Sequence, residues 1–385
     1  MLFQQQQNPW TIVLNLIFYA FLFISMFYGQ KIQFWTYSRK LEAALVKFKE
    51  MREETKILSK TKIIELRKMV AKQGKGQESE ISAKSLDSFL DEFLQFVMIQ
   101  PVSMDPAGII SKLDHLVNVR ENRWEETVEM LVPGIEDVPM FNLENLLEAT
   151  MAVDTVYRVV RHFYVQGKKS SSLILVMQMA MQIKMIQQMA EAYVKAAKAF
   201  YHGQPIGDAL GPQVSATFIR LENPQGIEAE DICKDTILQK VKYKNRNIYV
   251  IRAKGPGGTV GKPGQGIKIL IDRLKGDVDR IIMVDAAMKL EGEKTGSIVE
   301  GVGAAIGGLG VEKYKIEESS NKHKIPIDAF LCKQNLLDAI TAMKKSISNS
   351  VKDIVKRVQL TIINRTKEGS NVILAGIGNT IGIGI

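Results

Sequence analysis

The stretch NIYVIRAKGPGGTVGKPGQGIKILIDRL, residues 247–274, joins a short apolar run to an amphipathic run through a glycine-rich loop. NIYVIRA is rich in β-branched residues and predicts a strand, whereas GIKILIDRL spaces its apolar residues as a helix does. Glycines between a strand and a helix let backbone N–H groups approach an anion closely. The stretch therefore predicts an α/β unit with a candidate ligand loop.

The last third of the chain repeats this alternation. Apolar runs at 280–287, 325–332 and 371–378 predict strands, and TGSIVEGVGAAI (295–306) and residues 335–359 predict helices between them. Strands that alternate with helices favour a mostly parallel sheet with helices on its faces. We therefore expect a glycine-rich α/β domain over residues 221–385, with ligands bound at the carboxyl ends of its strands.

The loop matches no nucleotide-binding motif. In a P-loop, Pro256 would occupy the place of the first glycine and Pro263 that of the magnesium-binding Ser or Thr. In the dinucleotide fingerprint, Val260 stands where the third glycine belongs. Two interpretations stay open: an anion-binding loop, or tight turns that allow close packing between a helix and the sheet.

A second stretch rich in charged residues is RIIMVDAAMKLEGEKTG, residues 280–296, in which a predicted strand ends at an aspartate. If consecutive strands neighbour each other, this aspartate and the glycine loop meet at one edge of the sheet. The candidate ligand-binding residues are Gly257, Gly258, Thr259, Lys262, Asp285 and Lys289. The alternative for Asp285 is an N-cap before a solvated turn. No spacing indicates a catalytic residue, a metal site or a particular cofactor.

Residues 1–30 carry no charged side chain and include about 20 consecutive, mostly apolar residues, the length that crosses a bilayer. The first basic residue, Lys31, follows this run, and bulky Phe27 and Tyr28 stand where a signal peptide needs small residues. The segment predicts a single transmembrane anchor. Because positive charge lies on its C-terminal side, we expect the bulk of the chain in the cytoplasm.

The positive charge of the protein is local. Residues 31–72 contain twelve Lys or Arg and five Asp or Glu, so they carry +7 of the net +9. A basic segment beside a membrane is attracted to anionic lipid headgroups, which accounts for the charge. The sequence shows no nucleic-acid-binding signature, and we expect no nucleic acid as a partner.

The middle of the chain is helical in pattern. Residues 31–72 predict one basic helix, which is either a self-associating stalk or a solvated amphipathic helix packed on the next domain or on the membrane. Residues 73–85 predict a linker, and residues 86–220 predict a helical domain. Its acidic residues predict a solvated face rather than a metal site. These are Glu125, Glu126, Glu129, Glu136, Asp137, Glu144 and Glu148.

Four methionines, Met177, Met181, Met185 and Met189, recur every four residues and form one helical stripe. Such a stripe is first of all a core face, and the alternative is a contact between copies of the chain. Together with the long basic helix it predicts a homo-oligomer.

The chain as a whole resembles a family of archaeal single-pass membrane proteins described as a domain of unknown function. The resemblance rests on PIGDALGP (205–212), RAKGPGGTVGKPG (252–264), VDAAMKLEGEKTG (284–296) and GIGNTIG (376–382). It implies an archaeal source and supplies no catalytic residue. Two functions follow as expectations: a membrane-tethered protein whose α/β domain binds a phosphate-bearing small ligand, or a non-catalytic oligomeric membrane scaffold.

Overall fold

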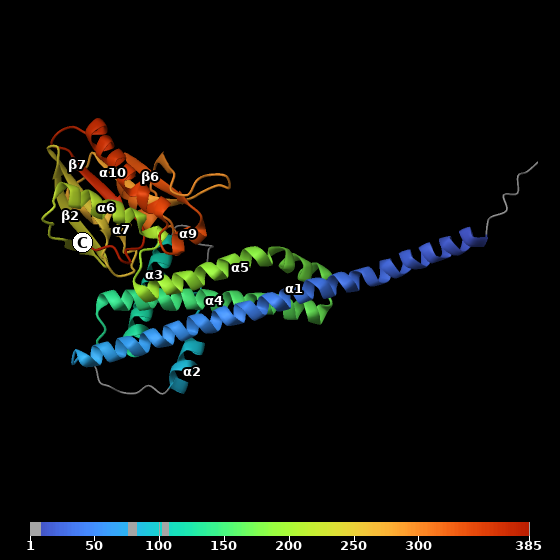
Figure 1. Cartoon of the computed structure of the whole chain (residues 1–385). Helices are drawn as coiled ribbons and strands as arrows, with labels where there is room; N and C mark the ends of the chain where they lie inside the picture. The colour runs from blue at the N-terminus through green and yellow to red at the C-terminus, as the bar shows by residue number, and fades with distance from the viewer. Residues whose placement is uncertain (1–8, 76–82, 100, 102–107, 385) are drawn as a thin grey trace, which may run out of the picture. The chain divides into compact units, whose positions relative to one another are not determined.

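The computed structural model describes residues 9–75, 83–99, 101 and 108–384 (Figure 1). Residues 76–82, most of the predicted linker, lie outside the described residues. The chain divides into two compact units, which we describe separately. One comprises Met1–Glu53 and Ala152–Glu191, and the other comprises Glu54–Met151 and Ala192–Ile385.

Five helices make up the first half of the described chain. They are α1 (Pro9–Lys72), α2 (Ala83–Phe93), α3 (Ile109–Leu131), α4 (Asp137–Ser170) and α5 (Leu173–His202). Helix α1 joins the predicted anchor and the predicted basic helix into one element. Between Pro9 at its start and Gly74 after its end, Gly29 is the only glycine or proline, and the helix continues through it. The predicted helical content of this half is confirmed.

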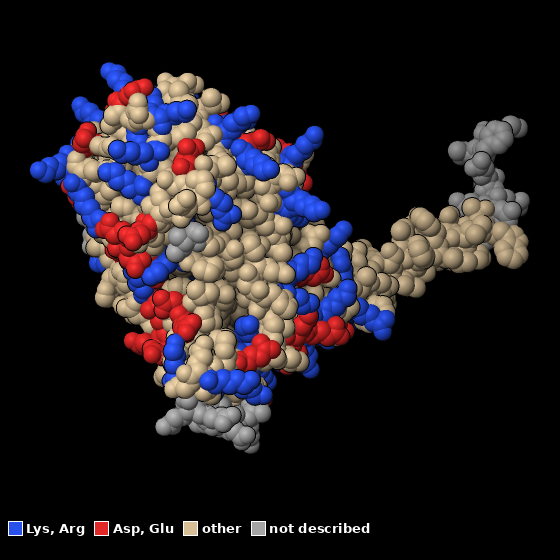
Figure 2. Space-filling model, turned by 60° about the vertical axis from the view of Figure 1, so that its left-hand side comes forward, with Lys and Arg blue, Asp and Glu red and all other residues tan. Residues whose placement is uncertain are grey.

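The N-terminal part of α1 shows no charged side chain where it adjoins the grey residues of Figure 2. Its large apolar side chains, such as Trp10 and Phe21, are exposed. Among the described residues no single helix meets the length and hydropathy needed to cross a membrane. Trp10–Met26 and Tyr28–Lys72 meet them only as a pair bent by 43°. The anchor therefore stays a prediction.

The first unit is a helical cluster. Leu41, Ala44 and Phe48 of α1 are buried against Val160 of α4 and against α5. Burial of this apolar seam within the chain favours a packed amphipathic helix over a stalk.

The methionine stripe of α5 does not form this core. Val176, Ala180 and Ile183 supply the buried face, while the side chains of Met181 and Met185 are 72% and 61% exposed. The expectation that the stripe is a core face is therefore wrong, because the helix turns its small and β-branched residues inward instead.

The second unit contains one seven-stranded sheet in the order β1-β2-β3-β7-β4-β6-β5. The strands are β1 (Glu230–Cys233), β2 (Thr236–Tyr243), β3 (Arg246–Ala253), β4 (Arg280–Met288), β5 (Ile298–Val302), β6 (Ile327–Gln334) and β7 (Asn371–Gly376). The four predicted strands, β3, β7, β4 and β6, form a parallel centre. Antiparallel strands flank it, so the sheet is mixed rather than mostly parallel.

Two local features produce the antiparallel edges. A two-residue turn at Lys244 and Asn245, both with positive φ, joins β2 to β3, and so short a connection allows only antiparallel pairing. At the other edge β5 pairs with β6, although TGSIVEGVGAAI predicts a helix. That prediction is wrong, because Gly301 and Gly303 disfavour a helix and β6 offers an open edge.

Helices cover both faces of the sheet (Figure 1). The helices of this part of the chain are η1 (Gly207–Ala209), α6 (Leu210–Glu222), α7 (Pro263–Arg273), α8 (Val311–His323), α9 (Leu336–Ile340) and α10 (Lys345–Arg365). One core joins α6 and α10 to the sheet, and a second joins α7 and α8 to its other face. Helix α6, which lies inside the predicted helical domain, thus packs on the sheet.

Candidate functional site

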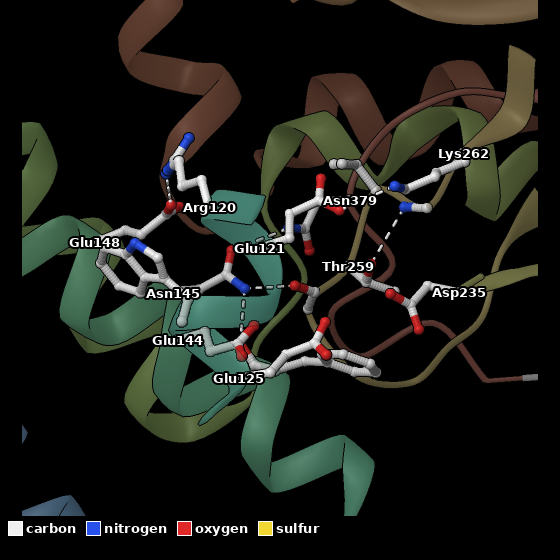
Figure 3. Close-up of a pocket in the computed structure, with 15 residues that line it drawn as sticks. Arg120, Glu121, Glu125, Glu144, Asn145, Glu148, Asp235, Thr259, Lys262 and Asn379 are labelled. Atoms are coloured by element: carbon white, nitrogen blue, oxygen red, sulfur yellow. Dashed lines mark hydrogen bonds and ion pairs between the residues drawn. The ribbon is translucent and has the colours of Figure 1, made fainter. Parts of the chain in front are cut away.

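A cavity of about 280 Å³ lies in the second unit, where the loop after β3 faces α3 and α4 (Figure 3). Its charged lining residues are Arg120, Glu121, Glu125, Glu144, Glu148, Asp235 and Lys262. The carboxylates of Glu125 and Glu144 lie side by side in Figure 3. The cavity is therefore lined by acidic side chains from α3, from α4 and from the turn between β1 and β2.

Asparagine side chains of α4 hold the glycine loop in place. The Gly258 N–H donates to Asn142 Oδ1 at 2.9 Å, and Asn145 Nδ2 donates to the Gly258 carbonyl oxygen. Asn379 Nδ2 in turn donates to Asn145 Oδ1 at 3.2 Å. A Cβ atom at Gly258 would lie 2.9 Å from Asn145 Nδ2, so the close approach requires glycine.

Most backbone donors of the loop already have partners. The Thr259 N–H donates to the Gly257 carbonyl oxygen at 3.0 Å, and the Gly261 N–H donates to Thr259 Oγ1 at 3.1 Å. The Lys262 N–H donates to Thr236 Oγ1 at 2.7 Å. An anion would have to displace these bonds, so the loop is built for packing on α4 more than for cradling a phosphate.

Both cations of the lining are paired. Lys262 Nζ lies 3.1 Å from Glu121 Oε2 and donates to Asn118 Oδ1. Arg120 forms an ion pair with Glu148. The positive charge of the cavity is thus neutralised by its own carboxylates.

Glu144 is the exception among the glutamates. Its Oε1 is buried and has no hydrogen-bond partner, whereas Glu125 Oε1 lies 2.7 Å from Lys234 Nζ. Burial above all, together with the negative charges of Glu125, Glu148 and Asp235, raises the pKa of Glu144 to about 8. At neutral pH this carboxyl group is therefore mostly protonated.

Asp235 adds a second carboxylate without an ion pair among the described residues. It sits in the turn between β1 and β2 with φ of 53°, and its carbonyl oxygen accepts from the Lys254 N–H at 2.9 Å. Burial, followed by the charge of Glu125, raises its pKa. With five carboxylates and two cations, the lining suits a ligand that brings positive charge or hydrogen-bond donors.

The structure divides the predicted site residues. Gly258, Thr259 and Lys262 line the cavity, Gly257 lies in the same loop outside the lining, and Asp285 and Lys289 are elsewhere. Strand β7 lies between β3 and β4, so the expectation that these two strands are neighbours is wrong. A strand from the end of the chain enters the centre of the sheet and separates the two stretches.

Asp285 instead meets another acidic residue. Asp285 lies within β4, which continues to Met288, so the strand does not end at this aspartate as predicted. Its Oδ1 accepts from the Ala286 N–H at 2.6 Å, and Asp208 Oδ2 accepts from the Asn379 N–H at 2.8 Å. Burial raises the pKa of Asp285 to about 8, and the nearby charge of Asp208 contributes to the rise. Lys289 Nζ donates to the Glu293 carbonyl oxygen at 3.3 Å.

Sequence reasoning missed the cavity glutamates. The prediction of a solvated acidic face is confirmed for four exposed residues, Glu126, Glu129, Glu136 and Asp137. The other three, Glu125, Glu144 and Glu148, line the cavity instead. A usable signal was present: Glu144 and Glu148 are like charges four residues apart on one helix, a pairing that is unfavourable without a compensating partner.

In the part of the chain that the structure describes, no group of three or more His, Cys, Asp or Glu side chains is placed to hold a metal ion. The carboxylates around the cavity are instead engaged with Lys and Arg or stand alone.

Two family models cover nearly the whole chain. Residues 15–203 match the model described as "Protein of unknown function (DUF1512) N-terminal domain", and residues 206–384 match "Domain of unknown function (DUF1512) C-terminal". Comparison with curated proteins and with solved structures finds no significant match.

Proposed function

We propose a function for this chain, which belongs to the family of proteins of unknown function DUF1512: it binds a small, positively charged ligand in the acidic cavity, and its N-terminal helix tethers it to a membrane. A protonated amine is the chemical class that the lining suits best. The cavity volume of about 280 Å³ fits a small metabolite.

The single observation that supports this ligand class is Glu144 Oε1, which is buried in the cavity wall without a partner. A buried polar atom normally has a hydrogen bond, and leaving it without one costs about 1–3 kcal/mol. An ammonium group supplies both the missing donor and the charge that allows Glu144 to ionise. The phosphate-bearing ligand expected from the glycine loop stays a prediction, and it would have to compete with Glu121 for Lys262.

We expect putrescine, as a diamine probe, to stabilise the full-length chain, and Glu144→Gln to weaken its binding at least tenfold. Because binding requires the ionised carboxylate, the affinity of the wild type should rise with pH up to about 8, by as much as tenfold per unit. Titration calorimetry in buffers of different ionisation enthalpy should also detect proton release on binding. At 100 times its dissociation constant a ligand adds about 2.7 kcal/mol of stability.

Glu129→Gln is the matched control, since Glu129 is exposed on α3 and outside the cavity lining. It should leave putrescine binding unchanged. Two results would contradict the proposed ligand class. One is equal binding of putrescine by the wild type and by Glu144→Gln. The other is that inorganic phosphate stabilises the chain through Lys262 while putrescine does not.

The membrane tether is supported by the uncharged residues 1–30, the exposed apolar side chains of α1 and the basic residues that follow them. The positive-inside rule assigns residues 31–385 to the cytoplasm.

We expect the full-length chain to stay in the membrane pellet after an alkaline carbonate wash. Replacing Leu16 and Phe23 together by Arg should release it, because each arginine at the centre of a span costs about 2.5–3.5 kcal/mol. Leu360→Arg, on the exposed surface of α10, is the control and should remain in the pellet. Release of the wild type into the supernatant would exclude the anchor.

The oligomeric scaffold remains the second candidate function. The observation that favours it is the exposure of Met181 and Met185 on α5, where adaptable apolar side chains face solvent. Self-association through this face stays a prediction.

A further inference from the structure

A second cavity, of about 250 Å³, lies between the C-terminal end of α6 and strands β2 and β3. In the antiparallel register, Gln239 pairs with Val250 and Ile237 with Arg252, so Gln239 and Arg252 are diagonal neighbours on one face of the sheet. That face also carries Val250, which packs in the core with α6. The register thus places Gln239 and Arg252 beside apolar side chains of the core under α6.

Arg252 is fully buried, with 0% of its surface exposed. Its Nη2 donates to the Gly384 carbonyl oxygen at 3.2 Å, but its Nε and Nη1 have no partner. No Asp or Glu among the described residues forms an ion pair with it. A guanidinium group in such a place is costly unless a negative charge accompanies it.

Arg246 on the same strand and face shows what a structural buried arginine looks like. Its Nε donates to Thr366 Oγ1 at 2.9 Å, and its Nη1 donates to the Lys244 carbonyl oxygen at 2.7 Å. Its Nη2 donates to the carbonyl oxygens of Thr366 and Ile363. The chain therefore satisfies one buried arginine with its own oxygen atoms and leaves the other open.

Further unpaired groups line the same cavity. Asn223 Nδ2 is a buried donor without a partner, and Gln239, which is 2% exposed, has an unpaired Oε1. Arg220 stands exposed in the last turn of α6 and forms no ion pair with any described residue. The residues that carry these unpaired N–H groups, Arg252 and Asn223, thus line one small cavity together with a second arginine, Arg220. The lining residues from Pro224 to Gly226 are exposed, so the cavity opens to solvent there.

We propose that this cavity is a binding site for a small oxyanion, a phosphate or a carboxylate, whose negative charge accompanies Arg252. Asn223 Nδ2 supplies a further donor, and Arg220 supplies positive charge at the opening. The volume is below the roughly 300–1,000 Å³ of sites for drug-sized ligands, so the ligand is the anion itself or a compound of a few atoms more. Burial lowers the pKa of Arg252 to about 10, which still leaves it charged at neutral pH.

The site is separate from the acidic cavity, since the two share no lining residue, and it does not rest on the proposed amine ligand. It also offers a better place for a phosphate than the glycine loop does. At the loop, Lys262 is paired with Glu121, whereas Arg252 forms no ion pair with any Asp or Glu that the structure describes.

The test measures thermal unfolding of the full-length chain in inorganic phosphate, in acetate and in chloride at equal ionic strength. We expect phosphate, acetate or both to raise the unfolding midpoint of the wild type and of Lys262→Ala. In Arg252→Met the apparent affinity for that anion should fall at least tenfold. Methionine keeps an unbranched, flexible apolar chain in the place of the arginine stem and removes a buried charge, so we expect this variant to fold.

Two more variants sharpen the result. Asn223→Ala removes one donor and should weaken the anion effect partially. Arg273→Met removes an exposed arginine of α7 that is paired with Glu230, and it should leave the effect intact. Absence of any anion effect in the wild type, an unchanged effect in Arg252→Met, or loss of the effect in Lys262→Ala would overturn the proposal.

Discussion

The substitution Gly211→Ala is expected to abolish the stable fold of the α/β part. Gly211 lies at the start of α6, where the helix backbone contacts Val284 of β4 and Ile377, the residue after β7. A Cβ atom there would lie 2.5 Å from the Val284 carbonyl oxygen and 2.7 Å from the Ile377 nitrogen, and closer still to the Ile377 carbonyl oxygen. These are backbone atoms of buried segments and cannot rotate away as a side chain does.

The expected loss exceeds the roughly 1–3 kcal/mol typical of an added methylene in a packed core, because α6 must move off the sheet as a whole. In an open helix the same change would stabilise by about 0.5–1 kcal/mol, so the sign itself is diagnostic. Gly301→Ala is the matched control, since nothing lies within 4 Å of its Cβ position. Soluble yield and chemical denaturation of both variants measure the effect, and wild-type stability of Gly211→Ala would disprove the close contact.

The substitution Asp285→Asn is expected to flatten the dependence of stability on pH. Burial, followed by the charge of Asp208, raises the pKa of Asp285 from 3.8 to about 8 in the folded chain. Between these values the folded state holds a proton that the unfolded state has released. The free energy of unfolding therefore falls as the pH rises from about 4 to about 8, and it levels off above that range.

One such proton changes the free energy of unfolding by up to about 1.4 kcal/mol per pH unit, so the summed effect is of the order of several kcal/mol. Asn keeps the shape of the side chain without the ionisation, and the variant should be more stable than the wild type above pH 8. Asp272→Asn, at an exposed position of α7, is the control. Denaturant unfolding at several pH values checks the prediction, and parallel curves for Asp285→Asn and wild type would show that Asp285 ionises normally.

The centre of the sheet was predictable because β3, β4, β6 and β7 are short apolar runs with turn residues at their ends. Buried parallel strands need apolar residues on both faces, and this requirement produces a short continuous apolar run in the sequence. The helix α7 after the glycine loop was predictable for the same reason, since its spacing alone reports its buried face.

The edge strands of the sheet have a weaker signal in the sequence. Strand β2, with Lys240 and Lys242 among apolar residues, reads as a polar segment until its pairing with β3 is known. Strand β5 contains glycine and is mostly exposed, so neither propensity nor burial distinguishes it from a loop. Pairing to an existing edge, which is not a local property, makes both segments strands.

The sequence by itself determined the helical first half, the uncharged N-terminal run, the parallel strands and the position of the glycine loop, because each depends on residues close together in the chain. Only the tertiary structure decided that β7 separates Asp285 from Lys262, that Glu144 of α4 faces that loop, and that Nε and Nη1 of the buried Arg252 have no partner. The physical reason is that charge neutralisation and hydrogen bonding depend on which groups meet in space, and these groups come from separate elements of the chain. Local periodicity indicates which face of a helix or strand is buried, but it does not indicate which residues of other elements that face contacts.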